Sequence, residues 1–229
     1  LGFTDMDPEG MLTWGFDQLG TMPTIYNYPY YPEHIKAIGG FEIDNKYVEN
    51  KLMVPEAVPE KYAKIAAMIQ KRYNLHVVKL TKKMVFDEGY GQKIFDLINA
   101  TYSHLYGYSQ LTQKQINQYI KMYLGMLDLE FVTLIEDWSG DERKLVGAGI
   151  SMPSLSIALQ KCHRGRMLPF GWWHLLRAIK FHKTKIVDLL LVGILPEYRA
   201  KGANALLFAD LIPIYQKYGI EWGETQVEM

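Results

Sequence analysis

The fold is decided by residues 185–219, which read KIVDLLLVGIL (185–195), PEYRAKGAN (196–204) and ALLFADLIPIYQKYG (205–219). The first part is an apolar run with a single acidic residue, which is typical of a buried strand. The second part is a short basic turn. The third part has the length and apolar content of a helix. We therefore predict a strand, a turn and a helix in this order.

The turn from Arg199 to Asn204 is predicted to bind an anion. A helix leaves its first four N–H groups without internal partners, and its dipole places partial positive charge there. Arg199 and Lys201 add full charges. The turn is not a Walker loop, because Lys201 precedes Gly202 instead of following it, and it lacks the three glycines of the dinucleotide fingerprint. An ordinary strand-to-helix connection remains the alternative.

On these residues the chain resembles the GNAT superfamily, the acyl-CoA-dependent N-acetyltransferases. The signature of that superfamily is Arg or Gln, two residues, Gly, one residue, then Gly or Ala. Arg199 and Gly202 match it. Asn204 stands at the last position and departs from it, although Asn tolerates the unusual backbone angles that such a loop needs.

The order of the remaining elements agrees with the resemblance. Apolar periodicity predicts strands at 76–83, 131–136, 145–152, 186–195 and 220–225, and helices at 88–106, 112–127 and 202–218. Strand, two helices, three strands, helix, strand is the order of a GNAT domain. The expected fold class is therefore α/β, or α+β with a mixed sheet: a GNAT-like acyl-CoA N-acyltransferase fold with a central twisted mixed sheet flanked by helices.

Three parts are predicted along the chain. Residues 76–229 form the GNAT-like domain, and residues 56–75 form a linker helix that begins at Pro59 and ends at Asn74. Residues 1–55 are expected to be the C-terminal part of a preceding GNAT-like unit or elements that complete this one, with a helix from Pro32 to Ile38 and short strands near 41–43 and 47–54. In the first case the chain would be a fragment of a tandem protein.

An insertion at 153–183 separates two of the predicted strands. It is expected to hold two short helices, the first capped by Ser154, and an apolar stripe lies on the second at Trp172, Leu175, Leu176 and Ile179. Basic residues surround the stripe: Lys161, His163, Arg164, Arg166, Arg177, Lys180, His182, Lys183 and Lys185. Three interpretations stay open: a lid over the acceptor site, a surface for a partner protein or lipid membrane, and a stripe docked on the sheet.

The resemblance implies where an acyl-CoA binds. The backbone of Val192, Gly193, Ile194 and Leu195 would pair with the pantetheine arm like an added strand, and one N–H there would polarise the thioester carbonyl. The pyrophosphate would lie on the turn, formed by Arg199, Ala200, Lys201, Gly202, Ala203 and Asn204.

Two acidic residues are candidate bases for acyl transfer to an amine. Asp188 is the one ionisable residue inside its apolar strand, and Glu224 lies on the next predicted strand. An amine near its ordinary pKa of about 10.4 must lose a proton before it attacks, so a base helps. The alternative for Asp188 is a place on the sheet surface or an ion pair with Lys185. The proton donor is not assigned; Tyr30 or Tyr31 could replace the usual tyrosine.

Composition excludes several classes of function. Lys plus Arg and Asp plus Glu number 25 each, so no net charge attracts the chain to nucleic acid. One cysteine, Cys162, excludes an internal disulfide and fits a reducing, cytoplasmic location. The histidines show no short metal-ligand spacing, and no apolar run is long enough to span a bilayer. Cys162 is not expected to be a nucleophile, because no oriented base accompanies it.

The sequence thus predicts an N-acyltransferase that moves an acetyl or other acyl group from acetyl-CoA or another acyl-CoA to an amine. The amine would attack the thioester directly. The acceptor would be a small molecule or a peptide. The alternative is a non-catalytic GNAT-like module that uses the insertion to bind a protein partner or a lipid surface.

Overall fold

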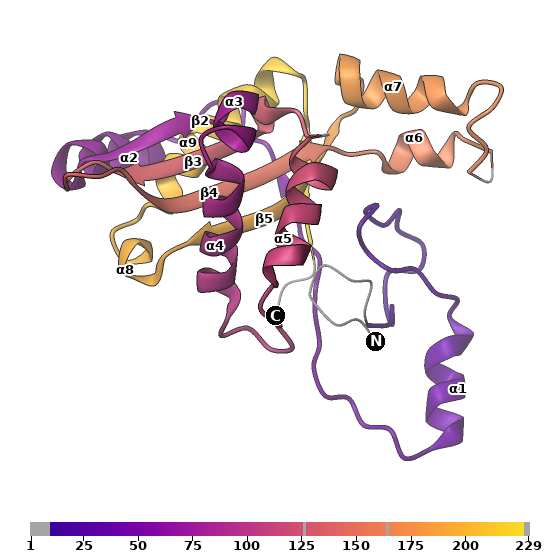
Figure 1. The fold of residues 1–229 in the computed structure, drawn as a ribbon. Coiled ribbons are helices and arrows are strands. Elements are labelled where there is room, and N and C mark those ends of the chain that lie inside the picture. The colour runs from indigo at the N-terminus through magenta and orange to yellow at the C-terminus, as the bar shows by residue number, and fades with distance from the viewer. Residues whose placement is uncertain (1–9, 126, 164, 227–229) are drawn as a thin grey trace.

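The computed structural model describes residues 10–125, 127–163 and 165–226, and a six-stranded mixed sheet forms its centre (Figure 1). The strand order is β1-β6-β5-β4-β3-β2. Neighbouring strands are antiparallel except β5 and β6, which are parallel. The strands are β1 (Lys51–Met53), β2 (Leu75–Lys79), β3 (Val132–Asp137), β4 (Lys144–Pro153), β5 (Ile186–Ile194) and β6 (Trp222–Thr225).

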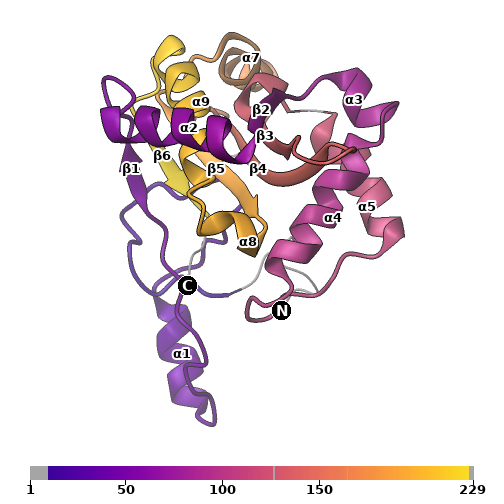
Figure 2. The same ribbon diagram turned by 90° about the vertical axis from the view of Figure 1, so that its left-hand side faces the viewer.

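Helices cover both faces of the sheet (Figures 1 and 2). One face carries α3 (Lys82–Phe86), α4 (Tyr90–Tyr102) and α5 (Gln113–Tyr119), which continues as the π-helical turn η1 (Ile120–Leu124). The other face carries α2 (Glu60–Tyr73) and α9 (Asn204–Lys217). The short α8 (Pro196–Arg199) follows β5, and η2 (Leu129–Phe131) precedes β3. The predicted mixed sheet flanked by helices is confirmed.

The core follows from strands that are apolar on both sides. In β3, Leu134 packs under α4 against Ile94 and Ile98, whereas the next residue, Ile135, packs against α2 and α9. Successive side chains of a strand point to opposite faces, so a strand between two helical layers needs apolar residues at every position. Each fully buried side chain of this size contributes roughly 1.5–3 kcal/mol.

The helix boundaries agree with their capping signals. Thr112 and Gln115 form a capping box at the start of α5. Asn74 ends α2 in the left-handed conformation, with φ of 50°. α4 is shorter than predicted and ends at Tyr102, and residues 41–43 form no strand. Residues 51–53 of the predicted 47–54 strand do form one, because only these pair with β6.

The helix predicted as a linker packs against α9. Ala66 and Ile69 of α2 are buried, and they share a cluster with Leu206 and Leu207 of α9. β1 likewise joins the sheet by pairing with β6. The division of the chain at 55/56 and 75/76 stays a prediction.

The insertion forms a helical hairpin, α6 (Ser156–Gln160) and α7 (Gly171–Phe181), that projects from one end of the sheet (Figure 1). Its ends meet at the sheet, where the N–H of Ser154 donates to the carbonyl of Ile186 at 2.9 Å. The predicted apolar stripe is divided. Leu175 packs against α6, whereas Trp172, Leu176 and Ile179 are exposed. The stripe is therefore not docked on the sheet, which corrects that interpretation.

The N-terminal segment before β1 contributes little to the hydrophobic core. Its one helix, α1 (Tyr30–Ile38), begins two residues before the predicted start, has no buried residue and extends away from the sheet (Figures 1 and 2). Tyr30 and Tyr31 lie on this helix, so the structure keeps these two candidate proton donors away from β5.

Candidate functional site

The two halves of β5 have different neighbours. The first half, Ile186–Leu189, pairs with β6 on one side, and all but its first residue pair with β4 on the other. Leu190 follows and has no partner residue in β4, since Leu189 pairs with Ser151 and Leu191 with Ile150. This β-bulge increases the local twist. The second half, Leu190–Ile194, pairs with β4 alone among the residues that the structure describes. The strand therefore opens away from β6 after the bulge.

Asp188 lies in the doubly paired half and is fully buried, with 0% of the residue exposed. Neither of its carboxylate oxygens has a hydrogen-bond partner in the described part of the chain. Lys185 is not its partner, because the Lys185 ammonium pairs with Glu221 at 2.5 Å. Both alternatives for Asp188, a surface place and an ion pair with Lys185, are therefore wrong.

Burial raises the pKa of Asp188 to about 6. The Ser154 hydroxyl acts in the opposite direction, and the negative charges of Glu224 and Glu49 add to the rise. Burial removes the solvation that stabilises the charged form of a carboxyl group, so the neutral form is favoured. A pKa near 6 makes Asp188 a better proton acceptor at neutral pH than an ordinary aspartate.

Glu224 shares a row of the sheet with Asp188. The register pairs Lys51 with Glu224, Glu224 with Asp188, and Asp188 with Met152, so the four side chains point to the face that carries α4 and α5. The indole N–H of Trp222 donates to the Glu224 carboxylate at 2.9 Å. The structure thus brings the two predicted acids onto one side of the sheet.

Glu49 is a third acid near this row, and the sequence did not indicate it. Asn50, the next residue, exchanges two hydrogen bonds with Thr225 of β6, each 2.9 Å long. Desolvation raises the pKa of Glu49, the Thr24 hydroxyl opposes the rise, and Glu224 adds to it. A segment without periodicity gives no signal for such a contact, because the contact depends on where β1 joins the sheet.

The open edge of β5 is held by Tyr102, the last residue of α4. Its hydroxyl lies 3.2 Å from both the N–H and the carbonyl oxygen of Val192. These backbone groups therefore point away from β4, toward the open side. Tyr102 is the second residue that sequence reasoning missed, because nothing in the sequence brings the end of α4 to β5.

Gly193 explains how α4 comes so close. A Cβ atom at this position would lie 2.8 Å from Oγ1 of Thr101, closer than side chains tolerate. Only glycine lets the end of α4 pack directly on the strand, which places Tyr102 at its edge.

The predicted anion-binding turn has the expected backbone. Gly202 has φ of +83°, a conformation that favours glycine, and a Cβ there would meet Ile69 at 3.3 Å. Within the described residues, the N–H groups of Lys201 and Asn204 make no turn or cap hydrogen bond to a backbone acceptor. These two donors, just before and at the start of the 14-residue helix α9, are thus available to an anion.

The two basic side chains of the turn are engaged elsewhere. The guanidinium of Arg199 donates from Nε to the carbonyl of Ile194 at 2.8 Å and from Nη2 to that of Thr101 at 3.4 Å. The Lys201 ammonium lies 4.2 Å from the ring centre of Tyr198. Arg199 therefore holds the end of β5 to α4 in this structure, whereas the sequence placed its charge beside the anion.

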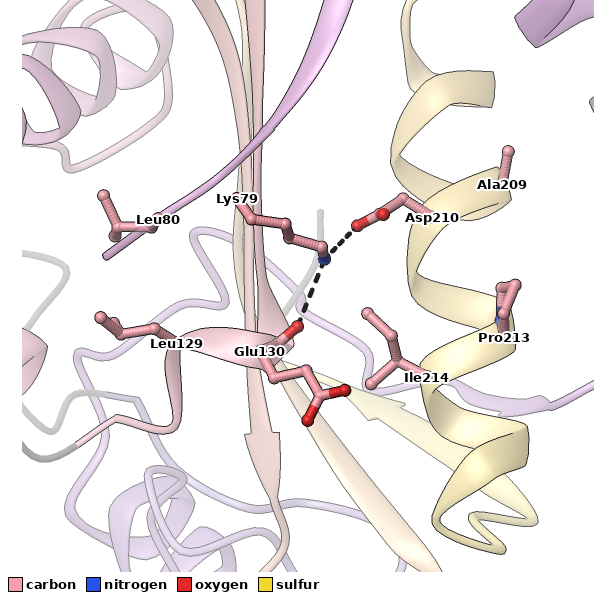
Figure 3. Close-up of a pocket in the computed structure, with 8 residues that line it drawn as sticks. All are labelled: Lys79, Leu80, Leu129, Glu130, Ala209, Asp210, Pro213 and Ile214. Atoms are coloured by element: carbon pink, nitrogen blue, oxygen red, sulfur yellow. Dashed lines mark hydrogen bonds and ion pairs between the residues drawn. The ribbon is translucent and has the colours of Figure 1, made fainter. Parts of the chain in front are cut away.

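A shallow depression of about 510 Å³ lies elsewhere, between β2, η2 and α9 (Figure 3). Its charged groups are paired: Lys79 with Asp210, and Glu130 with Lys217. It borders α9, on the face opposite to Asp188. Paired charges in an open depression offer little to a ligand, so this is not the candidate site.

Other candidate groups contribute no chemistry. Cys162 is buried, and its thiol donates to the carbonyls of Ala158 and Gly171. Among the described residues, no three His, Cys, Asp or Glu side chains are grouped to hold a metal ion.

One solved structure resembles the chain over most of its length. It is a fungal multi-domain GH3 β-N-acetylglucosaminidase with a GCN5-related glucosamine N-acetyltransferase region, and the match has a TM-score of 0.50 at 11% identity. The chain has a GNAT-like fold. The alignment covers 88% of this chain and 20% of the fungal one. At this identity the likeness concerns the fold alone.

A bacterial ceramide synthase of Caulobacter vibrioides is 22% identical over 140 residues. The alignment covers 57% of this chain and 35% of the synthase, so the chain corresponds to about a third of that protein. No family model matches the chain.

Proposed function

We propose that the chain is an N-acyltransferase that takes an acyl group from an acyl-CoA and joins it to an amine. The observation that carries the proposal is the opening of β5 beside Asp188: a buried carboxylate lies on the strand whose second half has an edge that β6 does not pair with, and a basic turn follows that strand. The GNAT-like fold supports it.

The donor would bind along the open half of β5. Its pantetheine arm would pair with Val192 and Ile194, replacing the contacts that Tyr102 and Arg199 now make with these residues. Its pyrophosphate would accept hydrogen bonds from the N–H groups of the turn. Arg199 would then be released to contact a phosphate, as the sequence predicts.

The chemistry needs a base and a donor to the carbonyl oxygen. The amine nitrogen attacks the thioester carbon, the C–N bond forms, the C–S bond breaks, and CoA leaves as a thiolate that takes up a proton. Asp188, directly or through water, accepts the proton that the amine loses. The Val192 N–H donates to the carbonyl oxygen as negative charge develops on it. Glu224 is the second candidate base.

The acceptor we favour is a long-chain amine. A ceramide is an amide of such an amine, so the synthase that resembles this chain forms the same kind of bond. The single cysteine and the acyl-CoA donor favour the cytoplasm.

Calorimetry with CoA and acetyl-CoA tests the proposal, with Asn204→Asp as the diagnostic variant. Asn204 is exposed and begins α9, so an aspartate there favours the helix while its charge repels a pyrophosphate. We expect micromolar binding that falls at least about tenfold in the variant.

Asn117→Asp, on the exposed side of α5, makes the same chemical change far from the turn and should bind as the wild type does. If neither CoA nor acetyl-CoA binds the wild type, the proposal fails. The non-catalytic alternative would then stand, with the hairpin as the binding element.

A further inference from the structure

We infer that the α6–α7 hairpin is a docking element for an anionic membrane surface. The first observation is its charge. Residues 153–187 contain no Asp or Glu, while Lys161, Arg164, Arg166, Arg177, Lys180, Lys183 and Lys185 lie within them. The whole chain has no net charge, so this element concentrates positive charge that the remainder balances.

The second observation is an apolar tip. Leu168 is 76% exposed and Phe170 71%, and Trp172 and Trp173 follow at 46% and 42%. These residues occupy the loop between the helices and the start of α7, at the end of the hairpin remote from the sheet (Figure 1). Two tryptophans, a phenylalanine and a leucine exposed together form a patch that a monomeric domain rarely presents to water.

The arrangement of α7 suits an interface between water and lipid. Ala178 is buried and Leu175 packs against α6, so this side of α7 faces the inside of the hairpin. The outward side carries the exposed Trp173, Arg177 and Lys180. Tryptophan prefers the headgroup region, and long basic side chains reach lipid phosphates while their stems lie along the acyl boundary.

The tip is preformed. The indole N–H of Trp172 donates to the carbonyl of Pro169 at 3.0 Å, and its backbone N–H donates to that of Met167 at 2.9 Å. A Cβ at Gly171 would lie 2.1 Å from the carbonyl oxygen of Arg166, so glycine is required for this close turn. A preformed surface loses little conformational entropy when it binds.

The base is fixed to the domain. His182, which ends α7, lies 2.8 Å from the Asp128 carboxylate, stacks on Phe131 and contacts the Tyr218 ring at a tilt. A hairpin anchored at its base and apolar at its tip can hold the domain at a defined distance from a bilayer. No helix in the described part of the chain is long and apolar enough to span a membrane.

A bilayer fits this surface better than a protein partner does, because the positive charge is spread over the whole element and the apolar residues gather at its tip. The charge complements anionic headgroups, each basic residue near them adding roughly fivefold to affinity. Docking would bring β5, into which the hairpin returns, close to the lipid surface. This inference requires no acyl transfer, so it can fail or hold independently of the proposed function.

Flotation of the purified chain with phosphatidylcholine vesicles, with and without phosphatidylglycerol, tests the inference. We expect binding to the anionic vesicles that weakens as salt is added and is at least about tenfold weaker on phosphatidylcholine alone. Leu168→Glu with Phe170→Glu should reduce binding at least about tenfold, because both residues are exposed and would insert into the lipid.

Two matched controls distinguish binding through the hairpin from non-specific binding to vesicles. Phe41→Glu changes an equally exposed phenylalanine, 64% exposed, outside the hairpin and should leave binding unchanged. Lys61→Glu with Lys71→Glu on α2, at the opposite end of the sheet, should reduce binding far less than Arg177→Glu with Lys180→Glu (Figure 1).

Quenching of tryptophan fluorescence by brominated lipids gives an independent readout. It should be lost in Trp172→Phe with Trp173→Phe, which keeps the apolar surface. Absence of binding to anionic vesicles, equal binding of the Leu168 and Phe170 variant, or quenching that survives the tryptophan changes would overturn the inference.

Discussion

The two halves of β5 belong to one strand but have opposite chemical character. In the first half, strands pair on both sides, and Asp188 is fully buried. In the second half, no strand of the described residues pairs with one side, Val192 is 52% exposed, and a tyrosine hydroxyl bonds its backbone there. Where strands pair on both sides, burial raises the pKa of a carboxyl group. Where one side is unpaired, the backbone edge can bind a ligand.

The largest effect should come from Asp188→Asn, which removes the charge from the doubly paired half. If Asp188 is the base, the rate of acyl transfer should fall roughly 10²–10⁴-fold. The wild-type rate should rise with pH through about 6 and then level off, because Asp188 must be ionised to accept a proton. A steady-state pH profile of both proteins, with acetyl-CoA and a long-chain amine, measures this.

The stability of the same variant should depend on pH in a defined direction. The folded-state pKa of Asp188, about 6, lies above its unfolded value, so its favourable contribution is complete below about pH 4 and is lost as pH rises through 6. A shift of about two pKa units corresponds to roughly 3 kcal/mol. In urea unfolding, the free energy of unfolding of the variant should therefore increase relative to that of the wild type between pH 4 and 7.

Asp137→Asn is the control of opposite sign. Burial there is outweighed by hydrogen bonds from Ser139 and Tyr198, so the pKa of Asp137 is lowered and its contribution is present at neutral pH and lost in acid. Its substitution should lower stability at pH 7. If the free energy of unfolding depended on pH in the same way in both variants, the opposite pKa shifts of Asp188 and Asp137 would be contradicted.

An intermediate effect is expected for Gly193→Ala, which alters how α4 approaches the open half. The new Cβ must displace Thr101, at a cost of about 1–3 kcal/mol. Thr101→Ala in the same chain should recover most of the loss, and Gly140→Ala, whose Cβ would be 3.8 Å from its nearest neighbour, should cost little. Thermal unfolding of these three variants and the wild type tests this. Failure of the Thr101 change to rescue would mean that α4 is not the obstacle.

The smallest effect should come from Tyr102→Phe. Removing the hydroxyl that must be displaced from Val192 should tighten CoA binding about threefold to tenfold, since a hydrogen bond of this kind contributes about 1 kcal/mol. Tyr108→Phe, whose hydroxyl donates to Asn99 instead, is the matched control. Weaker binding by the Tyr102 variant in calorimetry would show that the hydroxyl contacts the ligand instead of competing with it.

Much of the fold could be predicted from the sequence, because the signals are local. The Thr112 capping box, the left-handed Asn74 and the apolar run of β5 each act within a few residues, and the structure has elements at all three places. The strand predicted near 41–43 does not form. Such short segments become strands only where a partner is present, and pairing with β6 reaches only residues 51–53.

The candidate site could be predicted only in part. Asp188 and Glu224 are recognisable as acids on neighbouring strands, and the register does place them side by side. The sequence does not predict that Glu49, Tyr102 and Thr101 lie at the site, because contacts between distant parts of the chain bring them there. Arg199 is recognisable from a local motif, but its contacts are not. Its guanidinium bonds to Ile194 and Thr101 because the end of α4 lies beside it.

The bond between Ser154 and Ile186 means that the chain enters and leaves the hairpin at almost the same point. The segment between these two residues therefore joins β4 to β5 at one place, and His182 adds a second attachment through Asp128. A short turn would close the same gap without moving the register of β4 and β5. Changes in the length or sequence of the hairpin would thus reach the sheet only through these attachments at its base.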